Sequence, residues 1–185
     1  FDADGAVMDI ALHTVKIQNW DKTITVIPTY KLLDVTFKNW QGMVQSGGRR
    51  IKRALYIDLN SVKFCDEDMI AKFSGISLLK EYMSEKKAAY GEEISNKKIT
   101  NIGTFRKYME YYVNQHPNIH EHLTRMVRQL PSGPQGLPIE IYSFTNTTNW
   151  AEYENIQADI FDHLIAIMDD FELKIFQDPS GSDFN

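Results

Sequence analysis

One stretch, from Gly136 to Leu164, constrains the fold of this chain more than any other. Its pattern predicts a β-strand from Leu137 to about Thr145, a polar turn, and a helix that starts near Trp150. The turn ends in a capping signature, because the side chain of Asn149 can accept from a free helix N–H and Glu152 can reach back to the cap. A helix this one-sided must cover an apolar surface, and the sheet that holds the preceding strand is the nearest one. Eight residues are expected on its apolar face: Trp150, Tyr153, Ile156, Ile160, Phe161, Leu164, Ile167 and Met168.

The composition limits the class of protein. The chain has 185 residues, 43% hydrophobic and 24% charged, which suits one compact domain or two small ones. Its net charge of −5 argues against nucleic acid as a partner of the whole chain. The lone Cys65 excludes an intrachain disulfide and suits a reducing compartment. No run approaches the roughly 20 apolar residues of a membrane-spanning helix, no signal peptide is visible, and the start at Phe1 suggests a fragment of a longer protein.

The first part of the chain is expected to be a small β-unit. Alternating, β-branched segments predict short strands at 6–12, 13–19, 23–28 and 35–40, with a hairpin turn at 19–22 and one helical turn from Thr29 to Asp34. Four such strands favour an SH3-like or Sm-like unit, too small to be stable alone, so it should pack on the next domain or on copies of itself. Trp20, in the turn, either packs over the hairpin or forms a subunit contact.

A Gly-rich, polar stretch from Gln41 to Gly48 is the best linker candidate, so we expect a β-domain at 1–46 and a second domain at 47–185. A basic cluster follows at once. Nucleic-acid binding is one interpretation of it, but no aromatic residues interleave the charges. A charged surface strand, or pairing with acids of a neighbouring subunit, is the favoured alternative. The cluster comprises Arg49, Arg50, Lys52 and Arg53.

The second part has the element order of a ferredoxin-like βαββαβ domain with an extra helix, so the overall class is α+β. Strands are expected at 51–59, 123–130, 137–145 and 171–177, with the first and third adjacent in the centre. One helix starts near Asp66 and has apolar residues as far as Met83, and the charged segment 85–98 is an exposed excursion. A further helix spans 103–114 and is stopped by Pro117.

Candidate chemistry is sparse. His116, His120 and His122 lie close in sequence and could be metal ligands, but Pro117 breaks the segment, and a plain helix-to-strand connection is the alternative we favour. His163 is expected to be interfacial or capped, with a charge that responds to pH. Cys65 is expected to be structural. With no nucleophile elbow, phosphate-binding loop or HExxH motif, the sequence predicts no catalytic residue, no metal site, no cofactor and no enzyme activity.

The ordered series of segments resembles the small-conductance mechanosensitive ion channel (MscS) family over nearly the whole chain. The β-domain part of the resemblance rests on GAVMDIALHTVKIQNWDKTITVIPTYKLL, with family-motif positions at Gly5, Asp21, Ile27, Pro28 and Leu32. The second part rests on GLPIEIYSF, which contains Pro138, followed by the helix that starts at Trp150. Segments such as SGGRRIKR, TNIGTFR and QADIFDHL are most similar to the miniconductance, YbdG-like branch.

The resemblance implies the cytoplasmic vestibule of a homoheptameric channel in the bacterial inner membrane, which opens under tension and releases ions during hypoosmotic stress. Its implied partners are copies of itself, permeating ions, and the membrane through helices that this chain lacks; the fragment itself is expected to be soluble. The family's first β-domain strand is also missing, and the chain ends soon after Phe176. The alternative is a soluble RNA-binding protein, because Sm-like and ferredoxin-like folds also host RNA binders.

Overall fold

The computed structural model describes residues 3–95 and 98–178. They form two compact units, an N-terminal unit, Phe1–Gln41, and a C-terminal unit, Gly42–Asn185, and each is considered by itself. Both contain a small sheet, and helices are concentrated in the second, which confirms the α+β class. The domain borders expected after residue 46 stay a prediction.

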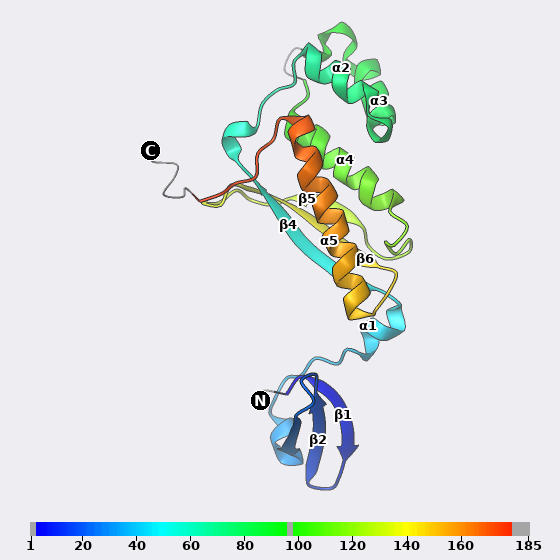
Figure 1. The fold of residues 1–185 in the computed structure, drawn as a ribbon, viewed down its shortest axis with the longest axis vertical. Coiled ribbons are helices and arrows are strands. Elements are labelled where there is room, and N and C mark those ends of the chain that lie inside the picture. Colours follow the sequence, from blue (N-terminus) through cyan, green and yellow to red (C-terminus); the bar gives the residue numbers. More distant parts are fainter. Residues whose placement is uncertain (1–2, 96–97, 179–185) are drawn as a thin grey trace. The chain divides into compact units, whose positions relative to one another are not determined.

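The N-terminal unit is an antiparallel sheet with the strand order β1-β2-β3 (Figure 1). The strands are β1 (Gly5–Ile10), β2 (Thr14–Asn19) and β3 (Ile24–Pro28), and a 3₁₀ helix, Thr29–Leu33, follows. The expected hairpin turn is present: Asp21 accepts hydrogen bonds from the backbone N–H and hydroxyl of Thr23 at 3.0 and 2.6 Å, which lowers the pKa of Asp21. Lys22 takes the positive φ of 74° that the turn requires.

The prediction of a fourth strand at 35–40 is wrong. This segment has no regular structure and is followed by a short helix, α1 (Gln41–Ser46), within the stretch expected to be a linker. Val35, Phe37 and Trp40, which suggested the strand, are exposed. Strand preference reflects packing on a half-buried pleated surface, and here no neighbouring strand offers that surface.

The C-terminal sheet is antiparallel, with the strand order β4-β6-β5. Its strands are β4 (Arg49–Ile57), β5 (Met126–Gln129) and β6 (Leu137–Thr145), and Ile51 lies opposite Ser143 while Val127 lies opposite Ile141. The first and third strands of the domain are therefore central neighbours, as expected. The closing strand at 171–177 is reduced to one bridge, Ile57 to Ile175, with backbone bonds of 2.8 Å on either side of it.

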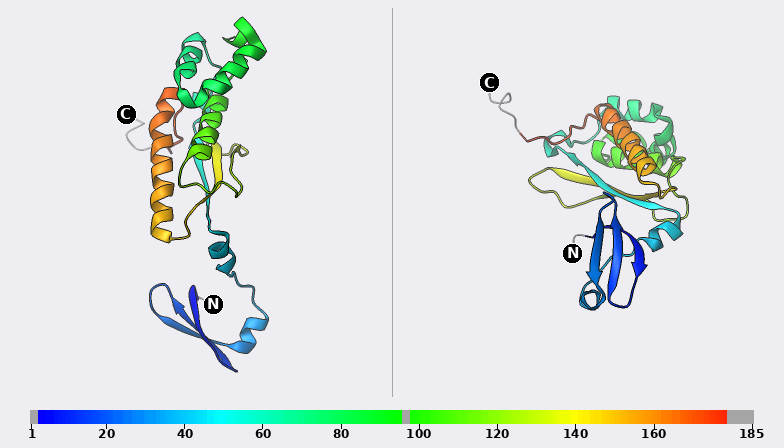
Figure 2. Two further views of the ribbon diagram at one scale, coloured as in Figure 1. Left: turned by 90° about the vertical axis from the view of Figure 1, so that its right-hand side faces the viewer. Right: turned by 60° about the horizontal axis from the view of Figure 1, so that its bottom comes forward.

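Helices α4 (Asn101–Gln115) and α5 (Trp150–Ile167) lie on one face of this sheet, and α2 (Glu67–Gly75) and α3 (Lys80–Tyr90) lie near its end (Figures 1 and 2). One long helix from Asp66 to Met83 was expected, but the backbone turns extended at Ile76, just after Gly75, and a 3₁₀ turn, Ser77–Leu79, separates α2 from α3. The segment 85–98 was expected to be an exposed or mobile excursion. Its first residues continue α3 to Tyr90 and are exposed or half-buried, whereas Ile94 is buried, and residues 96–97 lie outside the described part of the chain.

The core of the C-terminal unit is built around Phe171. Its ring centroid lies 5.0 Å from that of Phe73, 5.1 Å from Phe105 and 5.4 Å from Tyr108. These contacts join the 3₁₀ helix after α5, Met168–Phe171, to α2 and α4. Cys65 is buried beside them, and burial raises the pKa of its thiol to about 11, which suits the structural role expected from the sequence.

Helix α5 begins as expected. The side-chain oxygen of Asn149 accepts from the backbone N–H of Glu152 at 3.2 Å, so the cap is confirmed. The carboxylate of Glu152 instead accepts from the hydroxyl of Thr147 at 2.6 Å and does not reach back to the cap. The apolar face is confirmed except at Trp150, which is 61% exposed and donates to Glu154 at 2.9 Å, because it lies in the first turn, where α5 has not yet reached the core.

Candidate functional site

The apolar face of the N-terminal sheet is buried on β2 and β3 and exposed on β1. Residues paired across antiparallel strands point to the same face, and here the pairs Val7–Ile17, Ile10–Val15 and Val15–Ile27 are apolar. Val15 and Ile27 are 6% and 3% exposed, whereas Val7 and Ile10 are 56% and 73% exposed. The open part of this face therefore lies on β1, the edge strand.

Strand β1 combines exposed apolar side chains with a free backbone edge. Its pairing to β2 is interrupted by a bulge between Val7 and Asp9, where Met8 is also exposed. Gly5 is required at its start, because a Cβ atom there would overlap the carbonyl of Gln18. An edge strand with apolar side chains is a surface on which a further strand or a second copy can pack.

Further apolar side chains of the N-terminal unit are exposed. Trp20 in the hairpin turn is 60% exposed, and its indole N–H donates to the carboxylate of Asp4 at 3.1 Å. A subunit contact through Trp20 stays a prediction. Six other exposed apolar residues of this unit lie outside its strands: Leu12, Tyr30, Leu33, Val35, Phe37 and Trp40.

The family-motif residues lie in both units of the chain. Ile27 is buried on β3, Pro28 ends that strand, and Leu32 lies half-buried in the 3₁₀ helix. Pro138 is half-buried in β6 of the other unit, and Trp150 opens α5. Together with Gly5 at the start of β1 and Asp21 in the hairpin, these residues mark turns, strand ends and helix starts.

The histidines of the α4–β5 connection bond to the backbone. The Nδ1 atoms of His116 and His120 each accept from an N–H two residues later, at 3.2 Å, and the N–H of His120 donates to the carbonyl of Phe144 at 2.7 Å. Within residues 3–95 and 98–178, no group of three potential metal ligands is found. His116, His120 and His122 lie in the connection from α4 to β5, and their role stays a prediction.

His163 lies between α5 and α4. Its Nε2 atom is 2.7 Å from the hydroxyl of Tyr108, and its ring stacks on that of Tyr112 with centroids 4.2 Å apart. The edge of His116 meets the same Tyr112 ring. Burial lowers the pKa of both His163 and His116, since their charged forms lose solvation, while Asp159 partly offsets this for His116.

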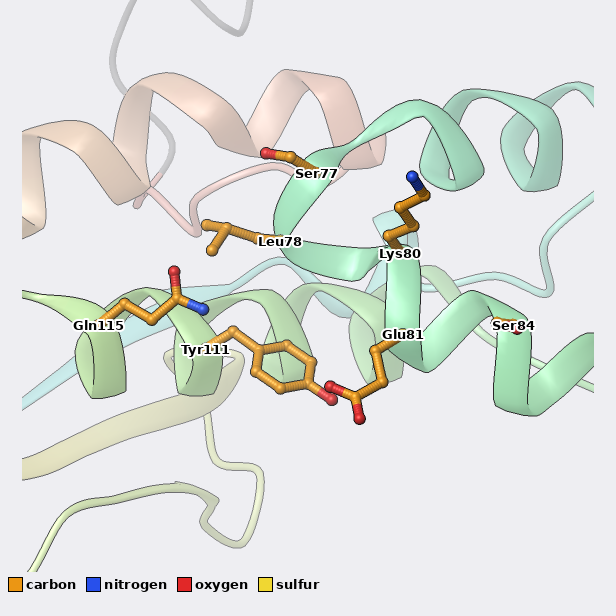
Figure 3. Close-up of a pocket in the computed structure, with 7 residues that line it drawn as sticks. All are labelled: Ser77, Leu78, Lys80, Glu81, Ser84, Tyr111 and Gln115. Atoms are coloured by element: carbon orange, nitrogen blue, oxygen red, sulfur yellow. The ribbon is translucent and has the colours of Figure 1, made fainter.

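A pocket that the sequence did not predict lies between α3 and α4, with a volume of about 480 Å³ (Figure 3). Figure 3 shows the side chains of Tyr111 on α4 and Glu81 on α3 among the lining residues, while Lys80 points away from them. The lining combines side chains of opposite charge with hydroxyl groups. Its residues are Ser77, Leu78, Lys80, Glu81, Ser84, Tyr111 and Gln115.

Two domain models match the chain in succession. The model described as "Mechanosensitive ion channel, beta-domain" matches residues 2–42, and that described as "Mechanosensitive ion channel MscS, C-terminal" matches residues 112–175. The chain belongs to the MscS family of mechanosensitive ion channels. This is a family of channels and not of enzymes, and the matches do not decide between its branches.

Solved structures of this family have a similar fold. MSL1 of Arabidopsis thaliana, solved by cryo-EM, is 10% identical with a TM-score of 0.62 over 96% of this chain and 50% of that chain. The closed state of Helicobacter pylori MscS is 10% identical with a TM-score of 0.55 over 95% of this chain and 52% of that chain. This chain therefore spans about half the length of either protein. Among its described residues, no helix has the length and apolar character needed to span a bilayer.

Proposed function

We propose that these residues form the cytoplasmic vestibule of a channel that opens under membrane tension and releases ions during hypoosmotic stress. The observation that carries the proposal is the order of the two matches, with the β-domain at 2–42 and the MscS C-terminal domain at 112–175 of one chain. Placement at the bacterial inner membrane, and membership of the miniconductance branch, follow from the sequence resemblance alone and belong to the same proposal.

The N-terminal unit is the part that brings copies of the chain together. The edge strand β1, with Val7 and Ile10 open on the apolar face, supports this role, because burial of such side chains stabilises an interface at roughly 25 cal/mol per Å² of apolar area. Seven copies would form the ring that the resemblance implies. Gly5, Asp21, Ile27, Pro28 and Leu32 would hold the sheet in the shape that this ring needs.

In the C-terminal unit, Pro138 and Trp150 would mark the strand and helix on which the vestibule wall is built. Permeating ions would pass openings between copies of this unit. The net charge of −5 would bias the ions near the wall, within a Debye length of about 8 Å at physiological salt.

A chimera tests the channel role. In it, this chain replaces the matching half of Helicobacter pylori MscS, and currents are recorded from membrane patches under suction. We expect currents that rise with tension. The matched control carries a protein domain of similar size that does not belong to this family. A chimera that reaches the membrane and stays silent at every tension the patch survives would contradict the proposal.

A further inference from the structure

One face of the C-terminal sheet faces away from the helices. Helices α4 and α5 cover one face of this sheet (Figure 2). Alternate residues of a strand point to opposite faces, and the odd-numbered residues of β4 and β6, such as Ile51 and Ile141, are buried, except for Arg49 and Arg53. The even-numbered residues, with two from β5, form what we call the open sheet face. It comprises Arg50, Lys52, Ala54, Tyr56, Met126, Arg128, Pro138, Glu140, Tyr142 and Phe144.

The open sheet face is aromatic and basic. Tyr142 packs edge to face against Phe144 at 5.9 Å, and the guanidinium of Arg50 lies 5.7 Å from the centre of the Tyr142 ring. Tyr56 and Met126 are each 41% exposed. An exposed group of aromatic, Met and Arg side chains has the composition of a protein interface core.

The acid on this face is already neutralised. Glu140 is buried, and its carboxylate accepts from Arg128 at 2.6 and 2.8 Å. Arg50 and Lys52 are exposed and join no ion pair within the described part of the chain. The face therefore carries an excess of positive charge on a chain that is negative overall.

The outward side of α5 has the opposite character. Trp150–Ile167 contains no Lys or Arg, and its exposed acids include Glu154, Asp159 and Asp162. Neither Asp159 nor Asp162 forms an ion pair in the part of the chain that the structure describes. Three exposed small residues of the same helix, Ala151, Ala158 and Ala166, permit close approach of a second backbone, and Ile165 adds an exposed apolar side chain.

We propose that the open sheet face of one copy docks on the outward side of α5 of a second copy. The helix covers the opposite face of the same sheet, so the two surfaces cannot meet within one chain, and they are complementary in charge (Figure 2). A second copy is favoured over nucleic acid as the occupant because the net charge of −5 repels a polyanion. A contact between unlike surfaces leaves one of each free, so it extends to a third copy and can close into a ring. This inference rests on the proposed function, because it names the surfaces by which copies of the chain would assemble into the channel.

Charge reversal tests the contact. The self-association constant of the full chain is measured by sedimentation, and Lys52→Glu and Asp162→Lys are each expected to weaken it on the order of tenfold, because like charges then face each other. The double variant should regain wild-type affinity to within about threefold, since it restores opposite charges. Lys87→Glu, on the exposed side of α3, is the matched control and should leave the constant unchanged.

Cysteine pairing tests the same contact without relying on affinity. A mixture of Lys52→Cys and Asp162→Cys chains should form a disulfide-linked dimer under mild oxidation, and neither variant alone should do so. The double variant should form a ladder of linked copies. Disulfides within Lys52→Cys alone would overturn the proposal, as would a chain that stays monomeric at the highest attainable concentration. So would salt-sensitive binding of single-stranded RNA that Lys52→Glu abolishes.

The outcomes remain separate from those of the chimera. If the chimera conducts and the double variant does not regain affinity, the docking inference fails and the channel role stands. If the double variant regains affinity and the chimera is silent, the docking inference stands and the channel role fails.

Discussion

The two units of the chain bury their apolar side chains very differently. Among the described residues of the N-terminal unit, only Val15 and Ile27 are buried apolar residues, while most of its large apolar side chains are exposed. The C-terminal unit instead encloses a continuous core that reaches from Ile51 in β4 to Leu173 and includes residues of α2, α3, α4 and α5. A unit with two buried aliphatic residues cannot offset the conformational entropy of ordering about forty residues. The difference indicates that the second unit is stable by itself and that the first needs a neighbour.

The largest expected effect is in the core of the C-terminal unit. Phe105→Ala removes a fully buried ring from contact with Phe171, and we expect it to lower the free energy of unfolding by about 3–5 kcal/mol. The matched control is Phe37→Ala in the N-terminal unit, where the ring is exposed and the expected change is within about 0.5 kcal/mol. Urea unfolding followed by circular dichroism measures both. Equal losses would contradict the contrast between the units.

A buried polar residue gives the next largest effect, with an expected total loss of about 1–3 kcal/mol, because the bonds that it makes with Lys63 and Ser61 are only partly buried. Asn101 accepts from the N–H groups of Lys63 and Ile102 and donates to the carbonyls of Ser61 and Phe171, at 2.8 to 3.2 Å. Asn101→Ala leaves these groups unpaired, and each buried unpaired group costs about 1–3 kcal/mol. Asn155→Ala, on the exposed side of α5, should change the free energy of unfolding little. A small decrease in the free energy of unfolding for Asn101→Ala would show that water replaces these hydrogen bonds.

A smaller loss is expected at the start of α5. Asn149→Ala removes the acceptor for the N–H of Glu152, and loss of such a cap costs about 1 kcal/mol. Asn149→Asp keeps an acceptor and should preserve stability. If both variants lose stability equally, the cap does not act through this hydrogen bond.

The smallest effect is a pH dependence of the C-terminal unit. Burial lowers the pKa of His163 and His116 from the ordinary value of 6.5, so the unfolded chain binds more protons than the folded one as the medium becomes acidic. Their contribution to stability is complete above that value and is lost as pH falls through it towards the folded-state pKa. His163→Gln should reduce this pH dependence between neutral and mildly acidic buffer. If the urea midpoint of His163→Gln changes with pH as steeply as that of the wild type, other groups cause the pH dependence of stability.

The elements that depend on local rules could be predicted from the sequence. The start of α5 at Trp150 follows from its cap, and β6 was placed from Leu137 to Thr145 because its apolar run ends in a polar turn. Elements that depend on contact with another surface could not be predicted from the sequence. The segment 35–40 has a strand pattern without a strand beside it, and Trp150 has the right spacing on α5 but lies short of the core.

The candidate surfaces were visible in the sequence only in part. The basic cluster suggested pairing with acids of a neighbouring subunit, but the sequence did not separate Arg50 and Lys52 on the open sheet face from Arg49 and Arg53. The structure makes that distinction, because Arg49 lies over Tyr153 and Arg53 over Phe161 on the helix side. The aromatic neighbours Tyr142 and Phe144 come from β6, about ninety residues away, so only the strand pairing brings them to the basic residues.

Hydrogen exchange of the full chain over a range of protein concentrations tests the central claim most directly. We expect the amides of β4 and β6 to be protected at every concentration, and those of β1–β3 to gain protection only as copies associate, with association followed by sedimentation in the same samples. Strands β1–β3 that are fully protected in a dilute, monomeric sample would contradict the account, because the N-terminal unit would then be stable without a neighbour.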